Sequence, residues 1–155
     1  MTTTVQINKP TLQIGSQGAA VKELQTLINN FFNDPRLVVD GIFGSVTEVT
    51  VKEIQERFFL VVDGIVGSKT WAALMTRRNA ELPILRVGSQ GDLVRRVQDR
   101  LSIHGYALGA IDAAFGAKTE AAVKRFQVDH YLRADGVIGQ ETWMELSYLY
   151  PYVGC

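Results

Sequence analysis

The sequence predicts a mainly α-helical protein made of two tandem small three-helix modules joined by a short linker. Two observations predict this fold. A long stretch of the chain is repeated once, and apolar residues within each copy recur at helical spacing. The 155 residues suffice for one ordinary domain or two very small ones. We therefore expect two units, each with its own core.

The repeat becomes visible when Leu12 is aligned with Leu85. LQIGSQGAAVKELQ then lies over LRVGSQGDLVRRVQ, and further along VDGIVGSKTWAAL lies over ADGVIGQETWMEL, with the register shifted by a single residue in between. So small a shift over a whole unit indicates a duplication. We assign residues 12–75 and 85–147 to the two domains, 76–84 to a polar linker, and 1–11 and 148–155 to terminal tails.

Each unit is expected to hold three helices, each entered through a turn. The apolar stripes of the first helices are Val21, Leu24, Ile28 and Phe31, matched by Val94, Val97, Leu101 and His104. The second helices carry Val51, Ile54 and Phe58, matched by Val123, Phe126 and His130. The third helices are short, at 70–74 and from 142 to about 149. Ser89 and Asp92 resemble a capping box.

Four related stretches, DGIFGSVT, DGIVGSKT, DAAFGAKT and DGVIGQET, precede the second and third helices. An Asp carboxylate can accept backbone N–H groups two or three residues on, and Gly tolerates positive φ. We expect the apolar pair Ile42-Phe43 to point inward, and the Thr47 hydroxyl to satisfy an N–H group in the first helical turn. The stretches are therefore interpreted as a structural turn motif, which comprises Asp40, Gly41, Gly44, Asp63, Gly64, Gly67, Asp112, Gly116, Asp135, Gly136 and Gly139.

Glutamine and tryptophan residues recur at matched positions in the two units. Gln25, Gln55, Gln98 and Gln127 are expected first as hydrogen-bond partners of the turns and second as ligand donors. Trp71 and Trp143 are expected to close the two cores. His104 and His130 correspond to phenylalanines in the first unit, so packed rings are expected there rather than ligands or bases.

Composition and motif searches exclude several classes of function. Sixteen basic and sixteen acidic residues balance, which argues against nucleic-acid binding and a polybasic membrane anchor. No apolar run suggests membrane insertion, and the start does not read as a secretory signal. The single cysteine, Cys155, allows no intrachain disulfide or cysteine-rich metal site. No catalytic motif or cofactor-binding loop occurs, so we expect no enzyme, no metal and no cofactor.

The combined pattern resembles the peptidoglycan-binding domain, a small three-helix module attached to cell-wall hydrolases. The resemblance rests on Leu-x-x-Gly-x-x-Gly-x-x-Val, then Asp-Gly-x-Phe-Gly-x-x-Thr, then Asp-Gly-x-x-Gly-x-x-Thr-Trp-x-x-Leu, and it covers both units. It implies non-catalytic binding of a glycan strand or stem peptide in the cell envelope, with a separate cell-wall hydrolase as a possible partner. Without that family expectation, a chain lacking an export signal would be placed in the cytoplasm.

Each unit departs from the family pattern in places. Ala113 stands where the family has Gly, and there we expect the turn to relax rather than keep positive φ. Phe59 also stands where the family often has Gly. The second unit is the closer match, so the expected contact residues lie there. These residues are Tyr106, Ala107, Arg125, Tyr131 and Arg133.

Two other functions remain open from the sequence. A protein-interaction or structural module is the main alternative, because one scaffold can serve many functions and the tail carries Tyr148, Tyr150 and Tyr152. A small enzyme is the weakest hypothesis, because no catalytic constellation recurs in both units.

Overall fold

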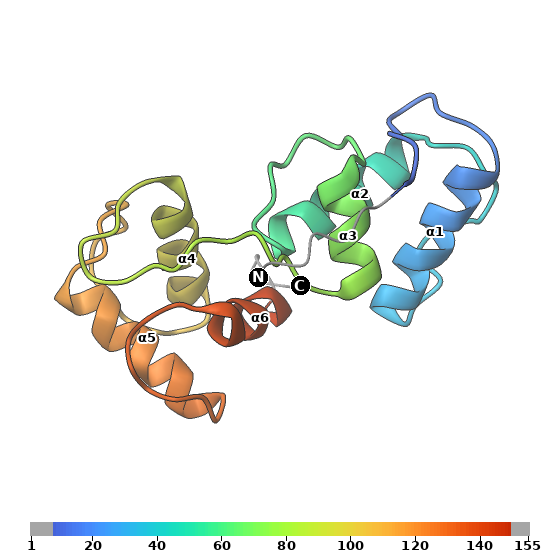
Figure 1. Ribbon diagram of the computed structural model, residues 1–155. Helices are drawn as coiled ribbons and strands as arrows, with labels where there is room; N and C mark the ends of the chain where they lie inside the picture. The colour runs from blue at the N-terminus through green and yellow to red at the C-terminus, as the bar shows by residue number, and fades with distance from the viewer. Residues whose placement is uncertain (1–7, 150–155) are drawn as a thin grey trace. The chain divides into compact units, whose positions relative to one another are not determined.

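The computed structural model describes residues 8–149, which form six α-helices and no extended strand (Figure 1). The helices are α1 (Ala19–Phe32), α2 (Ser45–Arg57), α3 (Ser68–Thr76), α4 (Asp92–Ile103), α5 (Ala117–Asp129) and α6 (Gln140–Tyr148). The expected mainly α-helical class with two three-helix modules is confirmed. Tyr150, Tyr152 and Cys155 lie outside the described residues.

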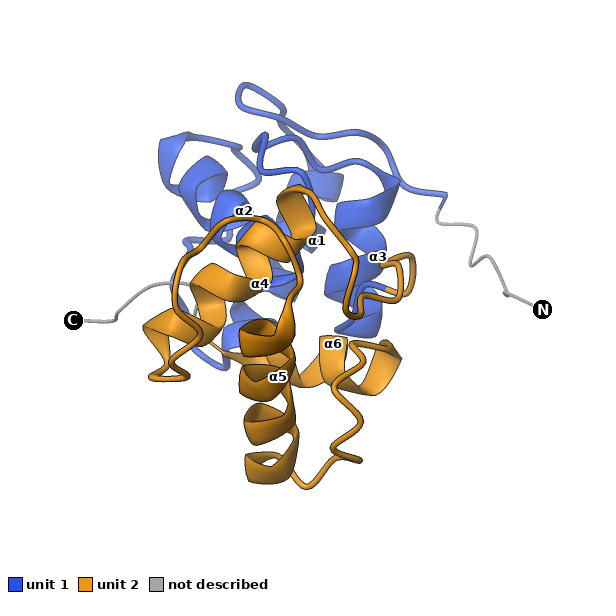
Figure 2. Ribbon diagram, turned by 90° about the vertical axis from the view of Figure 1, so that its left-hand side faces the viewer, with its two compact units in different colours: residues 1–79 blue, residues 80–155 orange. Residues whose placement is uncertain are grey.

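The chain divides into two compact units, residues 1–79 and 80–155 (Figure 2). The division lies within the stretch 76–84, where the sequence has a polar segment containing Pro83. In unit 1, α3 packs against both α1 and α2; in unit 2, α4 packs against α5.

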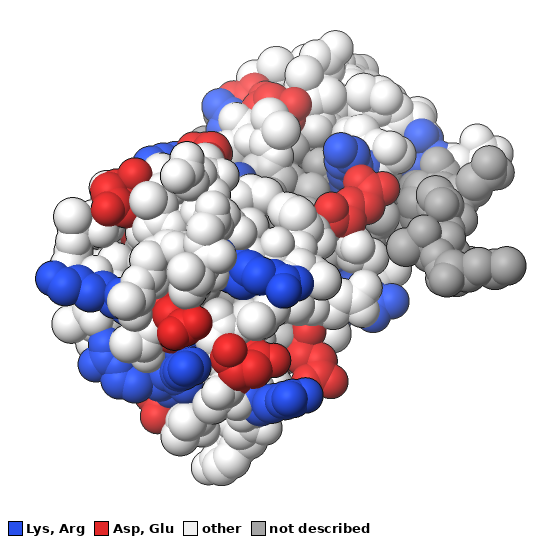
Figure 3. All heavy atoms as spheres, turned by 60° about the vertical axis from the view of Figure 1, so that its left-hand side comes forward, with Lys and Arg blue, Asp and Glu red and all other residues white. Residues whose placement is uncertain are grey.

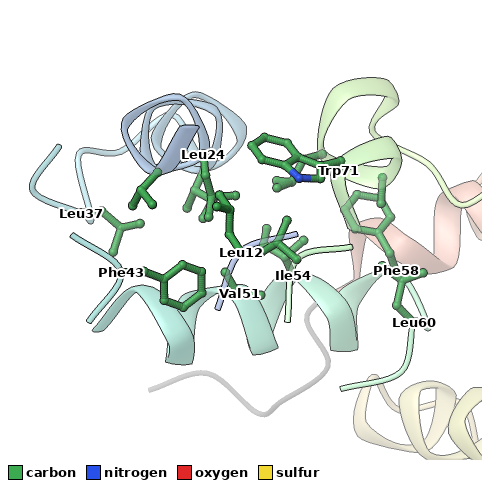
Figure 4. Packing of buried hydrophobic residues seen from close by; sticks show 14 residues of the cluster. Leu12, Leu24, Leu37, Phe43, Val51, Ile54, Phe58, Leu60 and Trp71 are labelled. Atoms are coloured by element: carbon green, nitrogen blue, oxygen red, sulfur yellow. The ribbon is translucent and has the colours of Figure 1, made fainter. Parts of the chain in front are cut away.

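The core of unit 1 lies between its three helices and two turns. Figure 4 shows Leu24 reaching inward from α1, Val51 and Ile54 from α2, Phe58 from the C-cap of α2, and Trp71 from α3. The Trp71 ring is fully buried, and its Nε1–H donates to the Pro10 carbonyl at 2.8 Å. Because this bond satisfies the indole N–H, Trp71 can contribute its whole ring to the core.

Unit 2 repeats this arrangement with other side chains. Trp143 is buried, and its Nε1–H donates to the Pro83 carbonyl at 2.8 Å. The other buried apolar residues in the described part of unit 2 are Leu85, Val94, Val97, Leu101, Leu108, Phe115, Ala122, Val123, Phe126, Ile138 and Leu146. The expectation that a tryptophan closes each core is confirmed.

Short backbone bridges fix the segments that precede the helices. In unit 1, Phe43 N–H donates to the Ser16 carbonyl and Gly18 N–H to the Gly41 carbonyl, both at 2.9 Å. Unit 2 repeats these two bonds at the same distance: the Phe115 N–H donates to the Ser89 carbonyl and the Gly91 N–H to the Ala113 carbonyl. The Gly-Ser-Gln-Gly turn therefore pairs with the first turn of the repeated Asp motif in both units.

All six helices begin at a glycine N-cap without a side-chain capping bond. The expected capping box at Ser89 is wrong, because Gly91 is the N-cap and the Ser89 hydroxyl instead accepts from the Arg86 N–H at 3.1 Å. Asp92 does lie in the first turn of α4, as expected, and pairs with Arg95.

Three further expectations fail at single residues. Only Phe43 of the pair Ile42-Phe43 points inward, whereas Ile42 is 52% exposed, because successive side chains of extended backbone face opposite sides. His104 is exposed rather than packed, while His130 is half-buried with its ring 4.2 Å from that of Phe126. The turn at Ala113 does not relax, since its φ stays at 63°.

Candidate functional site

A glutamine from a helix holds each of the four turns of the repeated motif. We call each set a glutamine clamp: it consists of the Gln, the turn Asp, the residue after that Asp, and the Thr in the following helix. The four clamps are Gln25/Asp40/Gly41/Thr47, Gln55/Asp63/Gly64/Thr70, Gln98/Asp112/Ala113/Thr119 and Gln127/Asp135/Gly136/Thr142. Every Gln and every Thr of the clamps is buried.

The hydrogen bonds of the four clamps are nearly identical. Each Gln Nε2 donates to the Asp Oδ1 at 2.9–3.2 Å, to a turn carbonyl at 3.0–3.1 Å and to the Thr Oγ1 at 3.1–3.3 Å. Each Gln Oε1 accepts the N–H of the residue after the Asp at 2.9–3.0 Å. Because every polar atom of the amide is used within the fold, these glutamines act as turn partners, as expected, and not as ligand donors.

The Thr hydroxyls have a different role from the one expected. Thr47 Oγ1 accepts from Gln25 Nε2 at 3.3 Å instead of serving a backbone N–H of α2. The same acceptor role recurs at Thr70, Thr119 and Thr142. The hydroxyl therefore ties the start of the next helix to the preceding helix through the glutamine.

The turn carboxylates accept bonds that favour their charged form. Asp40 Oδ1, for example, accepts the Ile42 N–H at 2.9 Å. Such backbone bonds are the largest cause that holds the pKa of Asp40 and of Asp112 below the ordinary value. The side-chain bonds, from Gln25 to Asp40 and from Gln98 to Asp112, lower the pKa further. The pKa of Asp135 is lowered mainly by the N–H of Val137, with Gln127 and the charge of Arg133 adding to the effect.

Three of the five expected contact residues are brought together at one edge of unit 2, where the loop after α4 meets α5. The Tyr106 hydroxyl donates to Asp129 Oδ2 at 2.7 Å, and its ring packs edge-on against Phe126 at 5.7 Å. Arg125 Nη2 donates to the Ala107 carbonyl at 2.6 Å. We call Tyr106, Ala107, Arg125 and Asp129 the α5 edge.

Burial and the neighbouring Asp129 raise the pKa of Tyr106 to about 12. The hydroxyl therefore keeps its proton at neutral pH and donates it to Asp129. Asp129 is the member of the α5 edge that the sequence analysis missed. Its spacing of four residues from Arg125 on a predicted helix could have indicated that the two share a face.

The other two expected contact residues, Tyr131 and Arg133, lie in the turn that follows α5. Both are exposed, and Asp135 N–H donates to the Arg133 carbonyl at 3.0 Å. No described bond joins either residue to the α5 edge.

The corresponding edge of unit 1 has different chemistry. In unit 2, the Tyr106 N–H donates to the Leu101 carbonyl at the end of α4. In unit 1, the Asp34 N–H makes the equivalent bond to the Asn29 carbonyl at the end of α1, so Asp34 takes the place of Tyr106. Glu53 stands in place of Arg125 and pairs with Arg36 at 3.0 Å, while the Arg36 guanidinium stacks 3.6 Å above the Phe32 ring. At this edge, unit 1 therefore has an ion pair between two of its own side chains and no tyrosine hydroxyl.

Unit 1 has a cavity of about 320 Å³ beside its second clamp. Its apolar lining comes from Leu60, Val61 and Ile65, and its polar lining includes Asp63, Ser68 and Lys69. In unit 2, Arg133 and Glu141 replace Val61 and Lys69. Two residues that line the cavity of unit 1 therefore have counterparts of different charge in unit 2.

Charges of both signs are interspersed over the face shown in Figure 3, without a large patch of either sign. Among residues 8–149, no group of three or more His, Cys, Asp and Glu side chains is placed to hold a metal ion. No helix within the same range is both long and apolar enough to cross a membrane.

One family model, described as "Putative peptidoglycan binding domain", matches the chain twice, at residues 17–74 and 90–146. The two matches begin next to Gly18 and Gly91, the N-caps of α1 and α4, and each includes both glutamine clamps of its unit. Together they account for well over half of the chain.

Similarity to known proteins extends over both units. An N-acetylmuramoyl-L-alanine amidase, CwlL, from Bacillus licheniformis is 34% identical over 89% of this chain and 45% of its own length. CwlM from Mycobacterium tuberculosis, also named as an N-acetylmuramoyl-L-alanine amidase, is 31% identical over 89% of this chain and 37% of its own length. The chain thus spans less than half of these relatives.

A solved structure of a peptidoglycan-binding protein from Clostridioides difficile, in complex with glutamine hydroxamate, is 43% identical over 44% of this chain and 42% of the other, with a TM-score of 0.42.

Proposed function

Because the chain belongs to the peptidoglycan-binding domain family, we propose that it binds bacterial cell-wall peptidoglycan through its two repeated units without catalysing a reaction. The family match over both units carries this proposal. The relatives named as amidases are matched along less than half of their length, and the matched family is one of binding domains. Catalysis is therefore ascribed to another part of those relatives.

We place the principal contact surface at the α5 edge of unit 2. It offers hydrogen-bond acceptors on Tyr106, donors on Arg125 and an exposed loop backbone at Ala107, as recognition of a polar polymer requires. The turn with Tyr131 and Arg133 adds an exposed aromatic and a cation. The glycan strand or its stem peptide is the ligand, the cell envelope is the site of action, and a separate cell-wall hydrolase is a partner.

Sedimentation with washed sacculi tests both the proposed binding of peptidoglycan and the proposed contact surface. The intact chain should pellet with the sacculi, and Arg125→Ala should lower the retained fraction several-fold, because the variant removes a donor and frees the loop at Ala107. The matched control is Glu53→Ala at the same position of unit 1, where the side chain pairs with Arg36 of the same unit. Failure of the unaltered chain to bind chemically distinct sacculi would overturn the function. Equal retention of both variants would overturn only the site.

A protein-binding role is the second candidate function, and one observation favours it. Unit 1 exposes branched aliphatic side chains at positions where unit 2 has alanine or charge: Val38 and Val61 are both 78% exposed, whereas unit 2 has Ala110 and Arg133. Exposed apolar side chains favour protein contact. Recovery of one stoichiometric protein with the immobilised chain, lost on replacing Val38 and Val61 by Ala, would support this role.

A further inference from the structure

Tyr131 occupies an unusual position, two residues after the end of α5. Its backbone is left-handed, with φ of 58°, and its N–H donates to the Val128 carbonyl while the next N–H, of Leu132, donates to the Gln127 carbonyl. This pattern ends a helix with one left-handed residue, for which Gly or Asn is preferred. A side chain with a Cβ strains the backbone there. Tyrosine at this position therefore weakens the fold.

Unit 1 shows how such strain can be offset. Phe59 has the same backbone, with φ of 57° and the same pair of closing bonds to Glu56 and Gln55. Its ring is only 4% exposed, so burial of the ring offsets the cost of the left-handed backbone. The turn geometry is therefore a property of the repeated fold and does not depend on the residue placed there.

Tyr131 has no such compensation. Its side chain is 98% exposed, so the ring contributes almost no buried area. Backbone strain that is not offset by burial of the side chain indicates that the residue contacts a ligand. We propose that Tyr131 is a ligand-stacking residue whose ring lies against the face of a pyranose in the glycan strand. This inference rests on the proposed binding of peptidoglycan and names the part of the polymer that is bound.

The surroundings of Tyr131 favour a sugar over an apolar protein surface. The charged residues Asp129 and Arg133, two residues to either side, are both exposed, and the exposed apolar side chains beside them are those of Ala134 and Val128. A protein interface places its aromatic residues within an apolar patch that excludes water. A pyranose instead combines an apolar C–H face, which suits an aromatic ring, with a rim of hydroxyls that nearby charged side chains can bind.

The test uses a substitution with opposite effects on stability and binding. In the intact chain, Tyr131→Gly should raise Tm by a few degrees, about the shift expected when roughly 1 kcal/mol of strain is relieved in a small domain. The same variant should bind about tenfold more weakly to two pelletable probes, washed sacculi and insoluble chitin, an N-acetylglucosamine polymer without stem peptides. If the ring had only a structural role, its removal would not raise Tm and weaken binding at the same time.

Two variants serve as controls. Tyr131→Phe keeps the ring face and should retain binding, whereas weakening equal to that of Tyr131→Gly would overturn stacking in favour of the hydroxyl. Ala113→Gly relieves the same kind of strain in another turn and should raise Tm with binding unchanged.

The outcomes separate this inference from the proposed function. If the unaltered chain binds sacculi and Tyr131→Gly binds equally well, stacking is wrong and peptidoglycan binding stands. If the effect appears with sacculi while chitin is never bound, the sugar assignment is wrong. If the unaltered chain binds neither probe, the proposed function itself fails. A lower Tm for Tyr131→Gly would overturn the strain argument.

Discussion

At Ala113 the first turn of unit 2 adopts a left-handed backbone with a side chain that disfavours it. Its φ is 63°, and the corresponding residue of unit 1, Gly41, has φ of 74°. The glutamine clamp explains why the turn does not relax. Gln98 Oε1 accepts a hydrogen bond from the Ala113 N–H at 3.0 Å, and the Ala113 carbonyl accepts one from the Gly91 N–H at 2.9 Å. Relaxing φ would break both bonds, and their combined worth exceeds the strain at one alanine.

Replacing Ala113 by Gly should therefore stabilise the protein. The gain is the relieved left-handed strain less the added entropy of the unfolded chain, about 0.5–1 kcal/mol in all. Urea unfolding measures it. The reverse change, Gly41→Ala in unit 1, should destabilise by at least as much, because its Cβ would lie 3.2 Å from the Gly18 carbonyl oxygen and from Lys22. A gain from both substitutions would contradict the strain argument.

The same residues show where the sequence suffices and where it does not. Gln25 and its three counterparts could be assigned to the turns because they recur at matched positions of the two units, each ahead of a turn Asp. Tyr131 could be expected at the surface as a contact residue, although the repeat aligns it with the buried Phe59. The exposure of His104 could not be predicted, because the repeat aligns it with Phe31, which packs against the core of unit 1. Duplication transmits the backbone geometry, whereas burial depends on neighbours that have diverged.

At the scale of elements, the glutamine clamp replaces side-chain capping. Each of α2, α3, α5 and α6 begins at a glycine with no capping side chain, and a buried Thr in its first turn is held by the glutamine of the preceding helix. The helix order and the turns were predictable from spacing and from Asp-Gly. The role of Thr was not, because the partner of its hydroxyl is set by tertiary packing.

The clamps also predict how stability depends on acidity. The folded-state pKa values of Asp40, Asp112 and Asp135 lie below their unfolded values, near 3.9. The stability that these carboxylates contribute is therefore fully present above about pH 4 and is lost as pH falls through the lower folded-state values. The free energy of unfolding, measured by urea titration between pH 6 and 2, should fall on the acid side.

Substitution of all three aspartates by asparagine tests the source of that fall. Asparagine keeps a side-chain oxygen for the turn N–H and for the glutamine, so the fold should persist while the acid-side slope becomes shallower. Asp99→Asn, which removes an exposed carboxylate of α4 outside the clamps, should change the slope far less. An unaltered slope in the three-site variant would show that other carboxylates dominate.

At the scale of the molecule, the two units share a frame and differ at their surfaces. The clamps, the tryptophan anchors and the backbone bridges are the same in both. Unit 2 has the Tyr106–Asp129 pair and the exposed Tyr131, while unit 1 has the Arg36–Glu53 pair and its exposed valines. We infer that the duplication conserved folding and freed each surface to contact a different part of one polymer or partner.

This difference leads to a prediction about the intact chain and its halves. Each unit has its own buried core, so residues 1–79 and 80–155, expressed separately, should each unfold cooperatively. If both surfaces contact sacculi, the intact chain should be retained at least tenfold better than either half, because the short linker makes the second contact intramolecular. An equimolar mixture of the two halves is the control, since it supplies both surfaces without the tether. Retention of residues 80–155 equal to that of the intact chain would assign all binding to unit 2 and leave the exposed aliphatic side chains of unit 1 for a protein partner.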